Sequence, residues 1–278
     1  MKEAPSRVRS LVTILAMTFL FAFQAQAQQE PARQDSGANY LAELHDFRLS
    51  NYQSLDAYYR FSASTDPAAL NEIVAGVNDA NDSMEVIVSS ELAVLSPEQL
   101  DQLNAEFDSF KDLMKENITV VRNTGYPDLR LSAELAEQAV VLNNLASELY
   151  QVAQESGETD PDERVETARS AAVTIARMMT KYSARSNSSV SQAFQGSSSE
   201  VALDEQARQF DAMLNKVKAG SAEGELKQLL DEISSKWLFI KGSYINFNEH
   251  NVSFVIGRYS QGIIERLGRV ITLLENQG

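Results

Sequence analysis

The segment that decides the fold is Ile175-Ala176-Arg177-Met178-Met179-Thr180-Lys181-Tyr182, because its setting recurs 130 residues earlier in the chain. A shift of 130 residues pairs Tyr52 with Tyr182, Ile73 with Leu203, Met84 with Leu214, Phe107 with Trp237, Phe110 with Ile240 and Lys111 with Lys241. Such self-similarity predicts an internal duplication of the fold. The alternative is that two unrelated amphipathic bundles share part of their apolar register. Both interpretations give two similar helical halves.

The first half contains the signals of four helices. Apolar residues recur at helical spacing from Tyr40 to about Ser64. Asp66-Pro67 supplies an N-cap and a first-turn proline for a second helix, and Ser96-Pro97-Glu98-Gln99 is a capping box that opens a third. A loop over residues 123–128, which contains glycine and proline, precedes the fourth helix.

The second half repeats this plan. We expect helices over about residues 162–193, 198–218 and 222–246, and a last helix that carries Val255 and Leu274 near its two ends. Short connections between helices favour antiparallel neighbours. The prediction is therefore an all-α fold made of tandem up-down antiparallel four-helix bundles. The sequence leaves open whether the halves form separate bundles or one continuous rod.

The predicted organisation of the chain has five parts. Residues 1–27 form a signal peptide, 28–38 a polar disordered leader, 39–154 the first bundle repeat, 155–163 an acidic linker and 164–276 the second repeat. The linker is assigned because it is the stretch richest in acidic and helix-breaking residues. The leader is assigned because it is polar and aperiodic.

The N-terminus has the three parts of a secretory signal. Lys2, Arg7 and Arg9 precede an apolar run over residues 11–23, and Ala25-Gln26-Ala27 offers a small-x-small cleavage site. We therefore expect cleavage after Ala27 and a periplasmic protein without a later membrane span. The alternative is an uncleaved N-terminal anchor.

Composition excludes several classes of site. The chain has no cysteine, which rules out disulfides, thiol nucleophiles and cysteine-bound zinc. Its formal net charge of −15 makes nucleic acid a poor partner, because phosphates would be repelled. The two histidines, His45 and His250, lack metal-site spacing and are expected to be solvent-facing or hydrogen-bonded polar residues. We predict no metal and no cofactor.

A family resemblance rests on Arg177-Met178-Met179-Thr180-Lys181, followed about sixty residues later by Ser235-Lys236-Trp237. Over about residues 165–275 the chain resembles the PilJ-like N-terminal domain of type IV pili methyl-accepting chemotaxis transducers. That domain is related to the periplasmic domains of nitrate-sensing histidine kinases. The resemblance implies a helical sensor domain in which the arginine of the run binds a small anion.

Carried over to this chain, the resemblance makes Arg177 the anion-binding residue. Lys181 and Arg185 follow one and two helical turns later, which places three cations on one side of one helix. A guanidinium suits a planar oxyanion because it donates two parallel hydrogen bonds. The alternative is that these cations pair with nearby carboxylates, as is usual in an acidic helical protein.

Aromatic residues gather near the C-terminus and include Trp237, Tyr244 and Phe247. They are candidates for a ligand pocket or a partner groove, and the alternative is that they form the bundle core.

Three functional hypotheses follow. The leading one is a non-enzymatic periplasmic protein that recognises a protein partner or a small ligand in the cell envelope. The second is a small-oxyanion binder that uses the basic helix face around Arg177. The third is an enzyme with an unrecognised site, which the absence of catalytic motifs disfavours. Whether the chain forms a homo-oligomer stays open.

Overall fold

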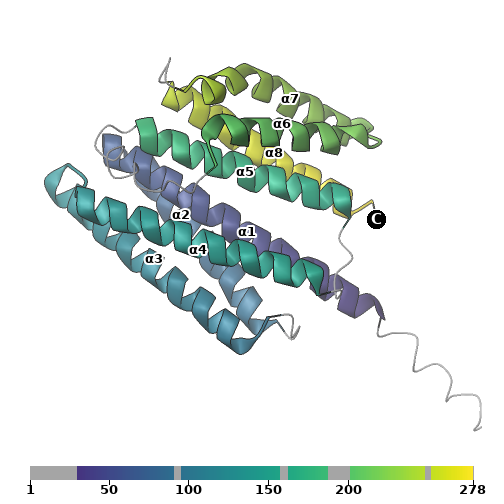
Figure 1. Cartoon of the computed structure of the whole chain (residues 1–278), viewed down its shortest axis with the longest axis horizontal. Helices are drawn as coiled ribbons and strands as arrows, with labels where there is room; N and C mark the ends of the chain where they lie inside the picture. The colour runs from purple at the N-terminus through teal and green to yellow at the C-terminus, as the bar shows by residue number, and fades with distance from the viewer. Residues whose placement is uncertain (1–29, 91–94, 157–161, 187–200, 248–251, 278) are drawn as a thin grey trace, which may run out of the picture.

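In a computed structural model, the protein is described over residues 30–90, 95–156, 162–186, 201–247 and 252–277, with side chains from residue 39. This part of the chain is all-α and contains eight helices and no strand (Figure 1). The helices are α1 Glu30–Ser64, α2 Pro67–Ser89, α3 Pro97–Thr124, α4 Leu129–Glu155, α5 Glu163–Ser186, α6 Leu203–Ala219, α7 Gly224–Ile245 and α8 Ser253–Glu275. The predicted fold class is confirmed. Within the same residues, no helix has both the length and the apolar character needed to cross a membrane.

Helices α1 to α4 form one four-helix bundle. Helix α1 packs against α2 and α4, and α3 packs against α4. Apolar faces of all four helices meet in one core, where for example the rings of Phe47 and Phe107 lie edge to face with centroids 5.1 Å apart.

Helices α5 to α8 form a second bundle with its own core. Helix α5 packs against α6 and α8, and α7 lies between α6 and α8. The core of this second bundle includes Phe210 and Trp237, whose ring centroids are 4.5 Å apart. The two halves are therefore separate bundles rather than one continuous rod.

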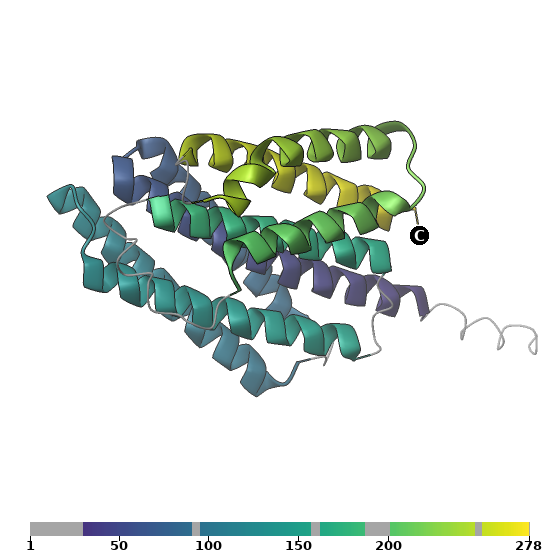
Figure 2. The ribbon, with the colours of Figure 1, turned by 45° about the horizontal axis from the view of Figure 1, so that its top comes forward.

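The two bundles lie side by side, and α1 and α5 form the seam between them (Figures 1 and 2). Thr180 in α5 donates a hydrogen bond to the carbonyl oxygen of Tyr52 in α1 at 2.9 Å. One turn later, Ser183 donates to Asp56 Oδ1 at 2.6 Å. The seam therefore carries buried polar contacts that join the two bundles.

Helices α2 and α3 begin at the predicted caps, and α4 begins at a similar cap, Asp128, that we did not predict. Asp66 and Asp128 accept hydrogen bonds from the backbone N–H groups of Ala68 and Leu131, each at 3.0 Å. Both hydrogen bonds of the capping box between Ser96 and Gln99 are present. Helix α3 ends at Gly125, whose φ of 80° is a conformation that glycine adopts without steric cost.

Three helix boundaries differ from the predicted ones. Helix α1 begins at Glu30, so its backbone runs through most of the segment 28–38 that we predicted to be disordered. A helix anchored by its buried part extends at one hydrogen bond per added residue, and Pro31 is tolerated in the first turn. Helix α6 begins at Leu203 and α7 at Gly224, later than expected. Residues 187–193, predicted as the end of the fifth helix, lie outside the described residues.

A shift of 130 residues in the sequence pairs core positions of the first bundle with core positions of the second. Phe107 and Trp237 are both buried on the third helix of their bundle, as are Phe110 and Ile240 one turn later. Met84 and Leu214 are both buried on the second helix. These equivalences fit a duplication, which stays a prediction.

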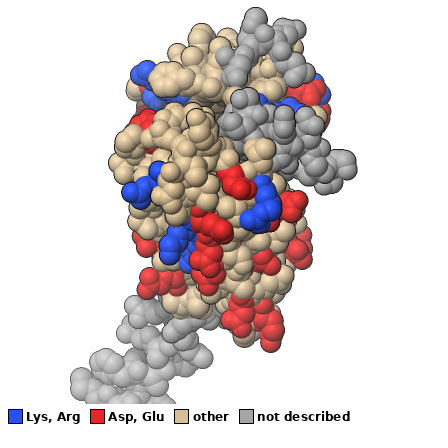
Figure 3. Space-filling view, turned by 90° about the vertical axis from the view of Figure 1, so that its left-hand side faces the viewer, with Lys and Arg blue, Asp and Glu red and all other residues tan. Residues whose placement is uncertain are grey.

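Surface charge is unevenly spread over the end of the molecule that Figure 3 shows. Asp and Glu side chains gather over the lower part of this face, and Lys and Arg side chains are scattered among them.

Candidate functional site

A pocket of about 170 Å³ lies at the seam between the bundles. Four helices contribute to its wall: Tyr52 and Leu55 from α1; Ala136, Ala139, Val140, Asn143 and Asn144 from α4; Arg177, Thr180 and Lys181 from α5; and Gln206 from α6, next to Val201. Ala136 and Ala139 on α4 contribute only methyl groups to this wall. The pocket therefore exists only where the two bundles meet.

Two cations predicted from the sequence line this pocket. Arg177 and Lys181 lie one turn apart on α5, and both are half-buried. Arg177 Nε is buried and has no hydrogen-bond partner among the described residues. Lys181 Nζ donates to the carbonyl oxygen of Val201 at 3.1 Å.

Among the described residues, Arg177 does not pair with a carboxylate, which was the alternative interpretation. No Asp or Glu is among the described residues that line the pocket, and within that part of the chain Arg177 makes no ion pair. The described wall of the pocket therefore has two cations and no carboxylate, in a protein with a net charge of −15.

Two amide side chains that border the pocket each have an oxygen that is inaccessible to solvent and lacks a donor. Asn143 Oδ1 and Gln206 Oε1 are buried and have no hydrogen-bond partner among the described residues. Their residues are 2% and 0% exposed, respectively. The NH2 groups of the two amides are occupied, because Asn143 Nδ2 donates to the Ala139 carbonyl at 2.9 Å and Gln206 Nε2 to the Val201 carbonyl at 2.7 Å. Sequence reasoning missed both residues, since neither lies in a recognisable motif.

Arg185, the third predicted cation, lies elsewhere. It is exposed, and its guanidinium covers the ring of Phe247 at 5.3 Å from the centroid. Helical geometry explains the difference, because residues four apart are offset by about 40° around the axis and residues eight apart by about 80°. Only Arg177 and Lys181 therefore share the pocket.

The predicted aromatic residues form part of the second core. Trp237 and Tyr244 are buried, and Tyr182 contacts both Tyr244 and Phe247 edge to face. The Trp237 Nε1 hydrogen bonds to Asp211 at 2.9 Å, which satisfies its polar group. Their contacts fit the interpretation as bundle core.

His45 differs from the expectation of a solvent-facing or hydrogen-bonded residue. It is buried, and its Nδ1 has no hydrogen-bond partner among the described residues. Burial, with the nearby charges of Arg169 and Arg48, lowers its pKa from 6.5 to about 3. The imidazole is therefore neutral at physiological pH. His250 lies outside the described residues, and in the rest of the chain no cluster of residues could hold a metal ion.

A buried charge network ties α4, α5 and α8 together near the other end of the seam. Arg169 donates to Glu166 at 2.8 Å and to Glu275 at 2.6 Å, and Glu166 also accepts the hydroxyl of Tyr150 at 2.5 Å. Every charge in this network has a partner, which gives it a structural role.

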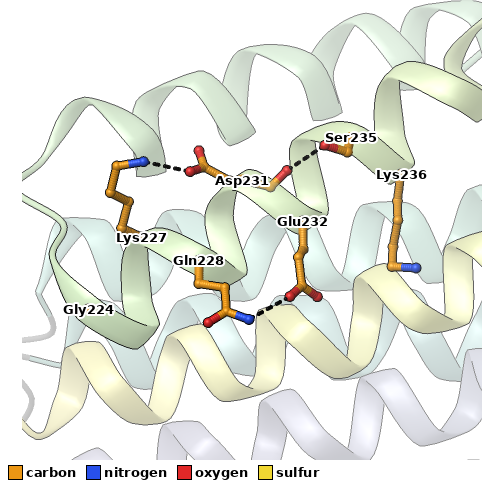
Figure 4. Close-up of a pocket in the computed structure, with 7 residues that line it drawn as sticks. All are labelled: Gly224, Lys227, Gln228, Asp231, Glu232, Ser235 and Lys236. Atoms are coloured by element: carbon orange, nitrogen blue, oxygen red, sulfur yellow. Dashed lines mark hydrogen bonds and ion pairs between the residues drawn. The ribbon is translucent and has the colours of Figure 1, made fainter.

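A second depression, of about 550 Å³, runs along the outer face of α7 (Figure 4). Three of its charged side chains have a partner within the depression: Lys227 pairs with Asp231 at 2.6 Å, and Glu232 accepts a hydrogen bond from the amide of Gln228 at 3.0 Å. All its lining residues belong to one exposed helix. The seam pocket is therefore the better candidate for a binding site.

Comparison with protein-family models, curated proteins and solved structures finds no match to this chain.

Proposed function

We propose that this protein is a non-enzymatic, periplasmic ligand-binding protein that takes a small anion into the pocket between its two bundles. The observation that carries the proposal is that the half-buried Arg177 lines the pocket, has no ion pair in the described structure and meets no described carboxylate in the pocket wall. A partly buried guanidinium without a counter-charge costs free energy, and a bound anion would supply that charge. Lys181 adds a second positive charge to the same wall.

Two features of the sequence support the wider setting of this proposal. The positive and apolar N-terminal segment supports export to the periplasm. The resemblance of residues 177–181 to the PilJ-like domain supports a sensory role, in which ligand binding would be passed to a partner in the cell envelope. Catalysis is not part of the proposal.

A thermal-shift screen against oxyanions and short carboxylates tests the proposal. A ligand at one hundred times its Kd stabilises the folded state by about 2.7 kcal/mol, which raises Tm by roughly 5–10 °C for a chain of this size. The stabilisation should disappear in Arg177→Gln and persist in Arg122→Gln, which changes an exposed arginine on α3. A screen in which no anion raises Tm, or in which both variants respond like the wild type, refutes the proposal.

A second candidate function is recognition of a protein partner by the outer face of α7 and α8. Leu238, Phe239 and Phe254 are 78%, 64% and 78% exposed there, and such clustered apolar exposure is typical of interaction surfaces. A partner captured from periplasmic extract by the wild type should be lost with Phe239→Ser and retained with Val74→Ser, an exposed apolar control on α2. Equal capture by both variants would exclude this surface.

A further inference from the structure

We infer that the outer face of α8 is the interface of a homodimer, in which a second copy of the chain lies antiparallel across it about a two-fold axis. The inference rests on the second candidate function, recognition of a protein partner by the outer face of α7 and α8, and names that partner. It comes from the charged and apolar side chains that α8 presents to solvent.

One stripe of α8 faces away from the rest of the protein. Phe254, Arg258, Gly262, Glu265 and Arg269 follow one another at spacings of three or four residues, which is the spacing of one helix face. None of the five is buried, and Phe254 is 78% exposed. The buried residues of α8 lie on its other side, where they belong to the core of the second bundle. The stripe is therefore free to contact another molecule.

Two opposite charges on this stripe have no partner. Within the described residues, neither Arg258 nor Glu265 makes an ion pair or a side-chain hydrogen bond, whereas Arg269 pairs with Glu225 on α7 at 2.9 Å. Arg258 and Glu265 are two helical turns apart, roughly 10 Å along the axis, which is beyond the three- or four-residue spacing at which helix side chains pair. Each charge is therefore available to a partner molecule.

A second copy of α8 presents the two charges in the matching order. In a two-fold interface both copies use the same surface, so if one residue contacts another, the reverse contact is also made. Laid antiparallel with the axis beside Gly262, α8 places Arg258 of each copy opposite Glu265 of the other. The same axis places Phe254 opposite Arg269, because these two positions lie four residues outside Arg258 and Glu265, and a guanidinium over an aromatic ring is a favourable contact. Each of these contacts is made twice.

Other partners match the stripe less well. An acidic partner would pair with Arg258 but would oppose Glu265 with a like charge, and a basic partner would do the reverse. A copy related by a two-fold axis supplies both signs at the required positions. The net charge of −15 makes two copies repel at long range, but physiological salt screens charges over about 8 Å, so the contacts within the interface decide the association.

Apolar side chains beside the stripe provide the burial that a dimer needs. Leu238 and Phe239 on α7 are 78% and 64% exposed, and Phe239 stacks on Tyr259 of α8 with ring centroids 4.8 Å apart. Helix α8 has 23 residues and is therefore about 35 Å long, and with α7 packed roughly 10 Å away the shared face measures on the order of 700 Å². Stable interfaces bury about 800 Å² per partner, so this face has the size of an ordinary dimer interface.

Sedimentation equilibrium of the purified protein at about 0.15 M salt tests the inference. We expect a dimer at protein concentrations on the order of 100 μM, since interfaces of this size have micromolar or smaller Kd values. Arg258→Glu alone, or Glu265→Arg alone, places like charges opposite each other at both ends of the interface, and each should raise the dimer Kd at least about tenfold. The double variant exchanges the two charges and makes them complementary again, so its Kd should return to within about threefold of the wild type.

Two controls separate the interface from general effects of surface substitution. Arg122→Glu makes the same charge change at an exposed position of α3 and should leave the dimer Kd unchanged. Phe254→Ser should weaken the dimer, whereas Val74→Ser, at an exposed apolar position of α2, should not. None of the substituted positions is buried, and circular dichroism verifies that each variant is folded.

The outcomes separate this inference from the candidate function on which it rests. A protein that stays monomeric over this concentration range overturns the homodimer, and so does a dimer that the single charge changes do not weaken or that the double change does not restore. Capture of a different protein that Phe239→Ser abolishes would then leave partner recognition by this surface in place. If the protein is monomeric and capture does not depend on Phe239, both the inference and the second candidate function fail.

Discussion

Acidification should destabilise this protein through His45. The imidazole is buried in the seam, and burial together with Arg169 and Arg48 lowers its pKa from 6.5 to about 3. Above pH 6.5 the histidine is neutral in both the folded and the unfolded chain and has no effect. Below pH 6.5 His45 becomes protonated in the unfolded chain but stays neutral in the folded protein. The free energy of unfolding therefore falls as the pH falls.

The size of this effect follows from the two pKa values. Between pH 6.5 and pH 3 the free energy of unfolding loses about 1.4 kcal/mol per pH unit from His45 alone. At about pH 5 the loss is therefore roughly 2 kcal/mol, and below pH 3 it stops growing. A loss of this size is a large part of the total stability of an ordinary domain.

Urea unfolding followed by circular dichroism at about pH 7.5 and pH 5 measures the effect. The wild type should lose about 2 kcal/mol more than His45→Gln over this interval, because the variant has no proton to take up at this position. His250→Gln, measured alongside, reports what the other histidine of the chain contributes. Equal pH dependence of the wild type and His45→Gln would refute the argument and would mean that the buried imidazole is protonated in the folded protein.

Two further predictions concern buried polar contacts, and both are measured by urea unfolding. Arg169→Met should cost about 3–5 kcal/mol because it leaves the buried Glu166 without its cation, whereas Arg130→Met, which breaks an exposed ion pair with Glu134, should change stability by less than about 1 kcal/mol. Similar costs for the two variants would contradict this. Tyr58→Phe should cost about 1–2 kcal/mol, since the hydroxyl donates to Asn117 Oδ1 at 2.8 Å inside the first bundle; a neutral change would show that the hydroxyl is dispensable.

Local signals in the sequence predicted most of the fold. The capping box of Ser96 and Gln99 works over three residues, so its geometry depends on nothing distant. Apolar residues at helical spacing, such as Leu103, Phe107 and Phe110 in α3, identify the buried face of a helix whatever it packs against. What the sequence left open was how the two bundles meet, because that contact joins α1 to α5 across more than a hundred residues.

The residues of the candidate site also fall into two groups, those that the sequence predicted and those that only the structure revealed. Arg177 and Lys181 were predicted together because they lie one turn apart on one helix, a relation that sequence spacing contains. Asn143 and Gln206 come from other helices, and only the approach of α4 to α5 and α6 brings them to the same pocket. The burial of His45 was not predicted for the same reason, because Arg169, one of the charges that lower its pKa, lies on α5 of the other bundle.

The contrast between cores and seam is itself an argument for where function resides. Each bundle has an apolar core cluster, and Asn143 and Gln206 are buried polar residues beside these clusters. A buried amide oxygen without a donor costs free energy, and a leucine or methionine of similar volume would avoid that cost. Natural proteins tend to break such local rules at functional sites. Around the seam pocket two buried acceptors break this rule next to Arg177, which has no ion pair among the described residues, and this concentration supports the pocket as the binding site.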